Sequence, residues 1–154
     1  MPVSVRTFFY FQQVEQLIRR TLGECLLASE LTAGQYMVLH LIARHDPISS
    51  ADLARKTMMT AQSMGEFIRA LEGKKLIERH STQSNKRTML ISPTVSGRKT
   101  LARCESRIDE AEREFFSCIS DEEVARLRLL MHRVRGANLG KEADLTMLPS
   151  PQDA

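Results

Sequence analysis

Apolar residues recur along most of this chain at spacings of three and four, which is the period of an amphipathic α-helix. The pattern covers residues 8–28, 33–45, 61–75 and 94–116, and a further apolar stripe follows a break at residues 120–123. The segment 33–45 is apolar almost all round, which is typical of a buried helix. We therefore expect this helix to lie at the centre of the core.

Hydroxyl side chains predict where several of these helices begin, because their oxygen can accept a hydrogen bond from a free N–H group of the first turn. Thr32 precedes the second helix, Ser49 opens a short one, and Thr60 precedes the next. The dipeptide at 46–47 is Asp-Pro, which ends the second helix because the residue before proline disfavours helical dihedrals. The two helices after Ser49 and Thr60 thus predict a helix-turn-helix.

Two short segments rich in β-forming residues, 76–81 and 87–92, flank a polar tip and predict a two-stranded hairpin. A hairpin directly after a helix-turn-helix makes a winged helix. The predicted fold class is therefore mainly α with a small β wing, in which a winged helix-turn-helix is flanked by N- and C-terminal dimerisation helices.

The same pattern divides the chain into four parts. We predict an N-terminal dimerisation helix, the DNA-binding winged helix-turn-helix, C-terminal dimerisation helices and a flexible tail, at residues 1–31, 32–100, 101–138 and 139–154 respectively. The terminal helices carry more apolar stripe than one small winged helix can cover, and such stripes usually mark an interface. A homodimer is therefore expected.

Charge is distributed unevenly along the chain. Residues 60–103 hold nine Lys and Arg against three Glu, a balance of +6, whereas the rest of the chain has 13 basic and 16 acidic residues. A basic region of this kind is expected of a protein that binds a polyanion such as DNA. A solvated basic surface without a partner is the alternative interpretation.

Other functional classes find little support in the sequence. No apolar run approaches the roughly 20 residues that span a bilayer, and the N-terminus has no signal-peptide pattern, so we expect a cytoplasmic protein without membrane contact. The four His residues form no pair at metal-ligand spacing, and there is no phosphate loop or catalytic triad. We therefore expect no metal, no cofactor and no enzymatic activity.

The motifs LTAGQYMVLHLI, ISSADLARKTMMTAQSMGEFIRALEGKKLIERH and NKRTMLISPTVSGRKTL follow one another from residue 31 onward. In order and spacing they resemble the multiple-antibiotic-resistance-regulator (MarR) family of bacterial transcription factors. The resemblance implies a homodimer whose terminal helices interlock and whose winged helices contact adjacent major grooves of a pseudo-palindromic operator in double-stranded DNA. It also implies that a small phenolic or aromatic effector relieves DNA binding, so a repressor is the favoured function.

The predicted DNA contacts come from the helix starts, the second helix of the helix-turn-helix and the wing tip. They are Ser49, Thr60, Gln62, Ser63, Arg69, Lys86 and Arg87. The chain departs from the family at Asn85, where an Asp usually precedes the wing Arg, and at Gly65 and Glu66, where Thr and Arg are frequent. Glu66 could accept a hydrogen bond from cytosine or could pair with Arg69.

The effector site predicted from the resemblance lies between the dimer helices and the winged helix. Its proposed ligand-binding residues are Met37, His40 and Arg113. Two alternatives remain open at this point, namely a winged-helix protein-interaction module without DNA binding and a cysteine-based redox-sensing regulator. For Cys25 we expect an inert buried thiol, because no basic residue adjoins it in the sequence.

Overall fold

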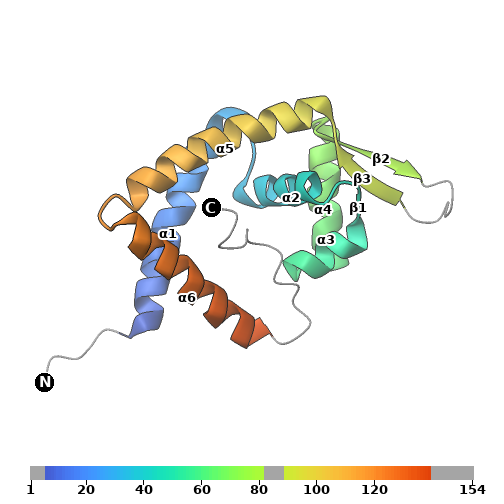
Figure 1. Cartoon of the computed structure of the whole chain (residues 1–154). Helices are drawn as coiled ribbons and strands as arrows, with labels where there is room; N and C mark the ends of the chain where they lie inside the picture. Colours follow the sequence, from blue (N-terminus) through green and yellow to red (C-terminus); the bar gives the residue numbers. More distant parts are fainter. Residues whose placement is uncertain (1–5, 82–88, 140–154) are drawn as a thin grey trace, which may run out of the picture.

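Helices make up most of the described part of the chain and are accompanied by one small sheet (Figure 1). The structure is a computed structural model, and it describes residues 6–81 and 89–139. The elements in chain order are α1 (Thr7–Leu26), the 3-10 turn η1 (Leu27–Ser29), α2 (Ala33–Arg44), β1 (Ile48–Ser49), α3 (Ser50–Thr57), α4 (Ala61–Gly73), β2 (Ile77–Ser81), β3 (Met89–Pro93), α5 (Val95–Phe115) and α6 (Asp121–Leu139). The predicted fold class, mainly α with a small β wing, is confirmed.

Hydroxyl caps begin the helices where the sequence predicts them. Thr32 accepts a hydrogen bond from the backbone N–H of Gln35, and the Gln35 side chain accepts one from the backbone N–H of Thr32. Ser49, Thr60 and Thr94 each accept a hydrogen bond from the backbone N–H three residues further on. Each such cap contributes about 1 kcal/mol to helix stability, so the start of each helix is encoded locally.

The core is built around α2, which contacts α1, α3, α4, α5 and β3. Its side chains Val38, Leu39 and Ile42 are fully buried, as the all-round apolar pattern predicts. Facing elements contribute the buried residues Leu26, Leu53, Met64, Ile68, Leu71, Ile91, Leu101 and Cys104. Burial of each large aliphatic side chain contributes roughly 1.5–3 kcal/mol, so α2 orders the elements around it.

The sheet has three antiparallel strands in the order β1-β3-β2. The predicted hairpin is formed by β2 and β3, with Ile77 opposite Pro93 and Ser81 opposite Met89. Residues 82–88 lie outside the described residues, and with them Lys86 and Arg87. The strand β1 was not predicted, because two residues carry no periodicity and it forms only by pairing with β3, with Ile48 opposite Ile91.

Helix α5 connects the winged helix-turn-helix to the terminal helices (Figure 1). Its first turn lies against the backbone of Leu76, and a Cβ atom on Gly97 would stand 1.9 Å from the Leu76 carbonyl oxygen. Glycine is therefore required at this close approach. Further along, Leu101 and Cys104 enter the core, and the C-terminal half of α5 runs beside α1.

The terminal helices leave apolar side chains in solvent. Of the described residues in α1, only Leu26 is buried, and α6 has none that are buried. The exposed apolar residues of these two helices are Phe8, Phe9, Tyr10, Phe11, Val14, Leu17, Leu129, Leu130, Met131 and Val134. We call this set the terminal apolar surface.

Within the described residues, no single helix is long and apolar enough to cross a membrane. The segments Thr7–Ser29 and Ala33–Arg44 together meet a length and composition criterion, but they are bent by 73° relative to each other. The second of them, α2, is the core helix described above.

The C-terminus of α4 carries local backbone strain. The helix ends at Gly73, but the residue in the left-handed conformation is Lys75, with φ of 58°. The backbone N–H of Leu76 donates to the carbonyl of Leu71, and that of Lys75 donates to the carbonyl of Glu72, which is the Schellman arrangement. A side chain in this conformation costs roughly 1–2 kcal/mol, a cost that glycine avoids.

Replacing Lys75 by Gly is therefore expected to raise the free energy of unfolding by about 1 kcal/mol, because it removes the steric cost of the left-handed conformation. Chemical denaturation monitored by circular dichroism measures this change. The matched control is Lys75→Ala, because alanine shortens the same side chain but keeps the Cβ atom that causes the steric cost. A loss of stability in Lys75→Gly equal to that of the control would show that Lys75 is not strained.

Candidate nucleic-acid interface

The helix-turn-helix consists of α3 and α4, which pack against each other. A turn joins them, and it begins at Met58, whose φ of 56° reverses the direction of the chain. Met64, Ile68 and Leu71 of α4 are buried, with exposed fractions of 0%, 1% and 0%. Because successive residues of a helix are rotated by about 100°, this burial fixes the opposite face of α4 as the one turned to solvent.

That opposite face presents Gln62, Glu66 and Arg69, all of them exposed. They stand at i, i+4 and i+7, so their side chains form one row along the helix. We call this row the outer face of α4. Gln62 and Arg69 were predicted from the sequence as DNA contacts, whereas Glu66 was not included. The spacing of Glu66 from Gln62 and Arg69 was the sequence signal that could have identified it as part of the same row.

The other described candidates have roles in local structure. The hydroxyl of Ser49 caps α3 and donates to the Asp52 carboxylate at 2.5 Å. The hydroxyl of Thr60 caps α4 and lies 3.1 Å from that of Ser63. These bonds hold the first turns of both helices in place, and contact of these residues with DNA stays a prediction. Lys86 and Arg87 fall outside the described residues.

Ion pairs neutralise part of the basic region. Arg79 pairs with Glu72 at 2.9 Å, and Arg98 pairs with Asp46 on the loop before β1. In the described ranges, no carboxylate pairs with three other basic residues of this region, Arg69, Lys75 and Lys99. Exposed cations without a protein partner are available for phosphate oxygens.

Asp52 illustrates how the start of α3 is fixed electrostatically. The hydrogen bond from Ser49 and that from Arg55 hold the pKa of the Asp52 carboxyl below its ordinary value. The carboxylate also lies in the first turn of α3, where the positive end of the helix dipole favours it. Arg55 is therefore already paired with the Asp52 carboxylate, so Arg55 is a weaker candidate for DNA contact than Arg69.

The three predicted effector residues differ in their surroundings. Met37 is half-buried against the core, and Arg113 is exposed near the end of α5. His40 already has a hydrogen-bond partner, because its Nδ1 lies 3.0 Å from Oε1 of Glu105 on α5. Arg113 lies eight residues further along the helix than Glu105, which is roughly 12 Å at 1.5 Å per residue. None of the three lines either of the two cavities described next.

A tyrosine accompanies this His40–Glu105 contact between α2 and α5. The ring centroids of Tyr36 and His40 are 6.1 Å apart. Burial raises the pKa of the Tyr36 hydroxyl to about 12, and the negative charge of Glu105 adds to the shift. Tyr36 therefore remains neutral at physiological pH, beside a carboxylate that is already paired with His40.

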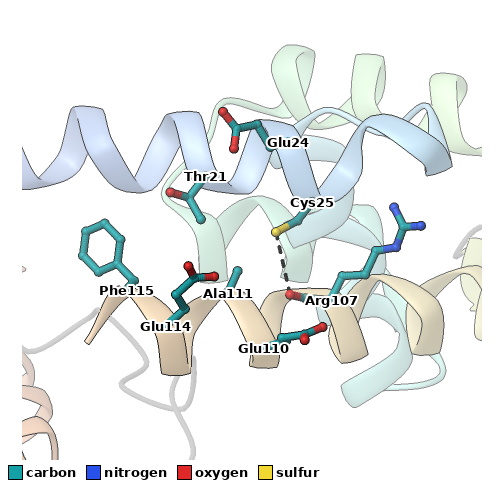
Figure 2. Close-up of a pocket in the computed structure, with 8 residues that line it drawn as sticks. All are labelled: Thr21, Glu24, Cys25, Arg107, Glu110, Ala111, Glu114 and Phe115. Atoms are coloured by element: carbon teal, nitrogen blue, oxygen red, sulfur yellow. Dashed lines mark hydrogen bonds between the residues drawn. The ribbon is translucent and has the colours of Figure 1, made fainter. Parts of the chain in front are cut away.

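A cavity of about 520 Å³ with both polar and apolar lining lies between α1 and α5 (Figure 2). The sulfur of Cys25 points toward α5 and contacts the carbonyl oxygen of Arg107 at 3.8 Å. Burial raises the pKa of the Cys25 thiol, and Glu24 contributes in the same direction. The reactive thiolate is thus disfavoured. The Cys25 side chain is half-buried and not buried as predicted, and its lack of redox activity stays a prediction.

A second cavity, of about 620 Å³, lies between α1, α5 and α6. Most of its lining is apolar, including Ile18, Leu22, Ile108, Phe115 and Leu127. Two side chains that can carry positive charge, Arg128 and His132, also line it. We call it the three-helix cavity. Among the described residues, no group of three or more His, Cys, Asp or Glu side chains is arranged to hold a metal ion.

Two short helices joined by a tight turn, followed by an antiparallel hairpin, define a winged helix-turn-helix protein. Residues 31–89 match the sequence profile of the MarR family. The similarity in fold extends to the flanking helices, because a solved MarR structure superimposes on 81% of this chain. Over residues 31–89 the chain is therefore similar to the MarR family.

Relatives match well beyond the winged helix. The chain is 26% identical over 119 residues to an uncharacterized HTH-type transcriptional regulator, YdcH of Bacillus subtilis, covering 75% of this chain and 81% of the relative. It is 26% identical over 104 residues to the HTH-type transcriptional repressor Mb2911 of Mycobacterium bovis, covering 68% and 75%. A crystal structure of mutant MarR from E. coli complexed with operator DNA has a TM-score of 0.75 at 25% identity, covering 81% of this chain and 90% of that one.

Proposed function

We propose that this protein is a dimeric, sequence-specific DNA-binding transcriptional repressor that a small aromatic ligand releases from DNA. The observation that carries the proposal is the outer face of α4, whose Gln62 and Arg69 are exposed while the opposite side of the helix is buried. An α-helix with its side chains is about 10–12 Å wide and fits the major groove of B-DNA, which is about 12 Å wide.

The chemistry of these side chains suits the groove. A Gln amide can donate to and accept from an adenine edge, and an Arg guanidinium can bond the two acceptors of guanine or a phosphate. Arg69 is not held by a protein carboxylate in the described structure, so binding DNA breaks no ion pair there. The similarity to MarR from E. coli, which was solved in complex with operator DNA, supports the DNA-binding part of the proposal. The similarity to the repressor of Mycobacterium bovis supports the repressor part.

The dimer part of the proposal rests on the terminal apolar surface. Phe8, Phe9, Tyr10 and Phe11 are between 44% and 80% exposed, and residues of this type bury roughly 150–250 Å² each when covered. With the apolar residues of α6, the surface exceeds the few hundred Å² that monomeric proteins usually expose. A second copy of the chain covers it, and the two-fold symmetry of the pair gives a pseudo-palindromic operator.

The effector part rests on the three-helix cavity, which has the volume of a small-molecule site and mostly apolar walls. An aromatic ring fits the apolar lining, and a ligand carboxylate can be met by Arg128 or His132. At present Arg128 donates to Glu112 at 2.7 Å. A ligand there changes how α6 packs on α1 and α5, and through α5 it changes the separation of the two α4 helices in the dimer.

DNA binding is tested with duplex fragments that the wild-type protein selects from a genomic library. Arg69→Ala is expected to weaken binding and, if the contact is to phosphate, to reduce the slope of log K against log salt by about one unit per monomer. The control is Arg113→Ala, which removes the same charge far from α4. Wild-type protein that selects no fragment would favour the protein-interaction alternative.

Dimerisation is tested by sedimentation equilibrium at micromolar concentration. The wild type is expected at twice the chain mass, whereas Val134→Glu introduces a charge on the terminal apolar surface and shifts the protein toward monomer. Val95→Glu is the control, because Val95 is 73% exposed but lies at the start of α5, outside that surface. A folded wild-type monomer would contradict this part of the proposal.

The effector is tested by titration calorimetry with a panel of salicylate-like and neutral aromatic compounds. A compound that binds the three-helix cavity is expected to lower DNA affinity, and Leu127→Trp, which fills the cavity, is expected to abolish its heat of binding. Met37→Leu serves as the control at the site predicted from the sequence. Retained binding in Leu127→Trp together with loss in the control would place the effector site between α2 and α5 instead.

A further inference from the structure

Glu66 occupies the middle of the outer face of α4. It lies one turn after Gln62 and three residues before Arg69, and all three are exposed. In the described residues, Glu66 makes no hydrogen bond or ion pair through its side chain. A surface that meets DNA thus presents an uncompensated carboxylate at its centre.

Pairing with Arg69 does not account for this carboxylate. The guanidinium of Arg69 lies over Gly65 instead, with Nη1 3.5 Å from the position that a Cβ atom on Gly65 would occupy. A helical side chain leans toward the N-terminus of its helix, so Arg69 reaches back over the residue one turn earlier. The absence of a side chain at Gly65 makes room for it and leaves Glu66 separate.

A carboxylate facing DNA meets two kinds of groups. Phosphate oxygens repel it, and so do the acceptor atoms of guanine and the O4 of thymine in the major groove. The exocyclic amino group of cytosine is a donor with no acceptor beside it on the same base, so it matches a carboxylate that can only accept. Adenine offers a donor too, but its N7 acceptor lies next to that donor and opposes the charge.

We propose that Glu66 is a specificity-determining residue that accepts a hydrogen bond from the amino group of one cytosine in each half-site. The inference rests on the proposed function, because it requires α4 to enter the major groove. Gln62 and Arg69 hold the helix on either side, and Glu66 reads the base between them. Its contribution is discrimination against the other three bases rather than added affinity.

The test compares sequence preferences in a randomised duplex library. Wild-type protein is expected to enrich cytosine at one position of each half-site, with a preference of roughly 5- to 150-fold over the wrong base. Glu66→Ala should lose that preference at this position alone. Glu66→Gln should shift it toward adenine, because an amide can both donate to N7 and accept from the amino group.

Glu110→Gln is the matched control, since it removes one exposed carboxylate on α5 and leaves α4 untouched. If both Glu66 variants keep the wild-type preference at every position, or bind all sequences more tightly by one common factor, the inference is overturned while DNA binding stands. If the wild type enriches no sequence at all, the proposed function fails and the inference fails with it.

Discussion

The one-sided burial of α4 against α2 is the constraint on which the rest of the arrangement depends. Met64, Ile68 and Leu71 lose their solvent contact to the core, and this fixes the rotation of α4 about its own axis. Had the helix turned by one residue, about 100°, a polar side chain would be buried without a partner, at a cost of about 1–3 kcal/mol. The outer face with its Gln, Glu and Arg is therefore a consequence of core packing.

Helix α5 connects the core around α4 to the terminal helices α1 and α6. Its start is held by the close approach of Gly97 to Leu76, its middle by Leu101 and Cys104 in the core, and its end by the cavity lining shared with α1 and α6. The His40–Glu105 contact adds a polar tie between α2 and α5. Helix α1 is thus connected to α4 through packed elements, because α1 contacts α5, α5 contacts α2 and α2 contacts α4.

The structure bears on the two alternatives that the sequence left open, a protein-interaction module and a redox-sensing regulator. A protein-interaction module does not need exposed cations without a carboxylate partner. In the described ranges, Arg69, Lys75 and Lys99 are such cations. A redox sensor needs a stabilised thiolate, whereas burial and Glu24 both raise the pKa of Cys25. The charge distribution therefore favours a DNA-binding protein, and the surroundings of Cys25 argue against this thiol as the redox sensor.

The helices and the hairpin could be predicted from the amino-acid sequence, because their signals are local. Thr32 and Thr94 accept hydrogen bonds from backbone groups only three residues away, and the apolar period indicates which side of α4 is buried. The β1 pairing, the His40–Glu105 contact and the three-helix cavity could not be predicted in this way, since they join residues far apart in the chain. The tertiary structure also separated Arg69 from Glu66, which spacing alone allowed to pair, because the choice depends on where a long side chain finds room. Contacts of this kind have no periodic signature in the sequence, and so they follow from packing alone.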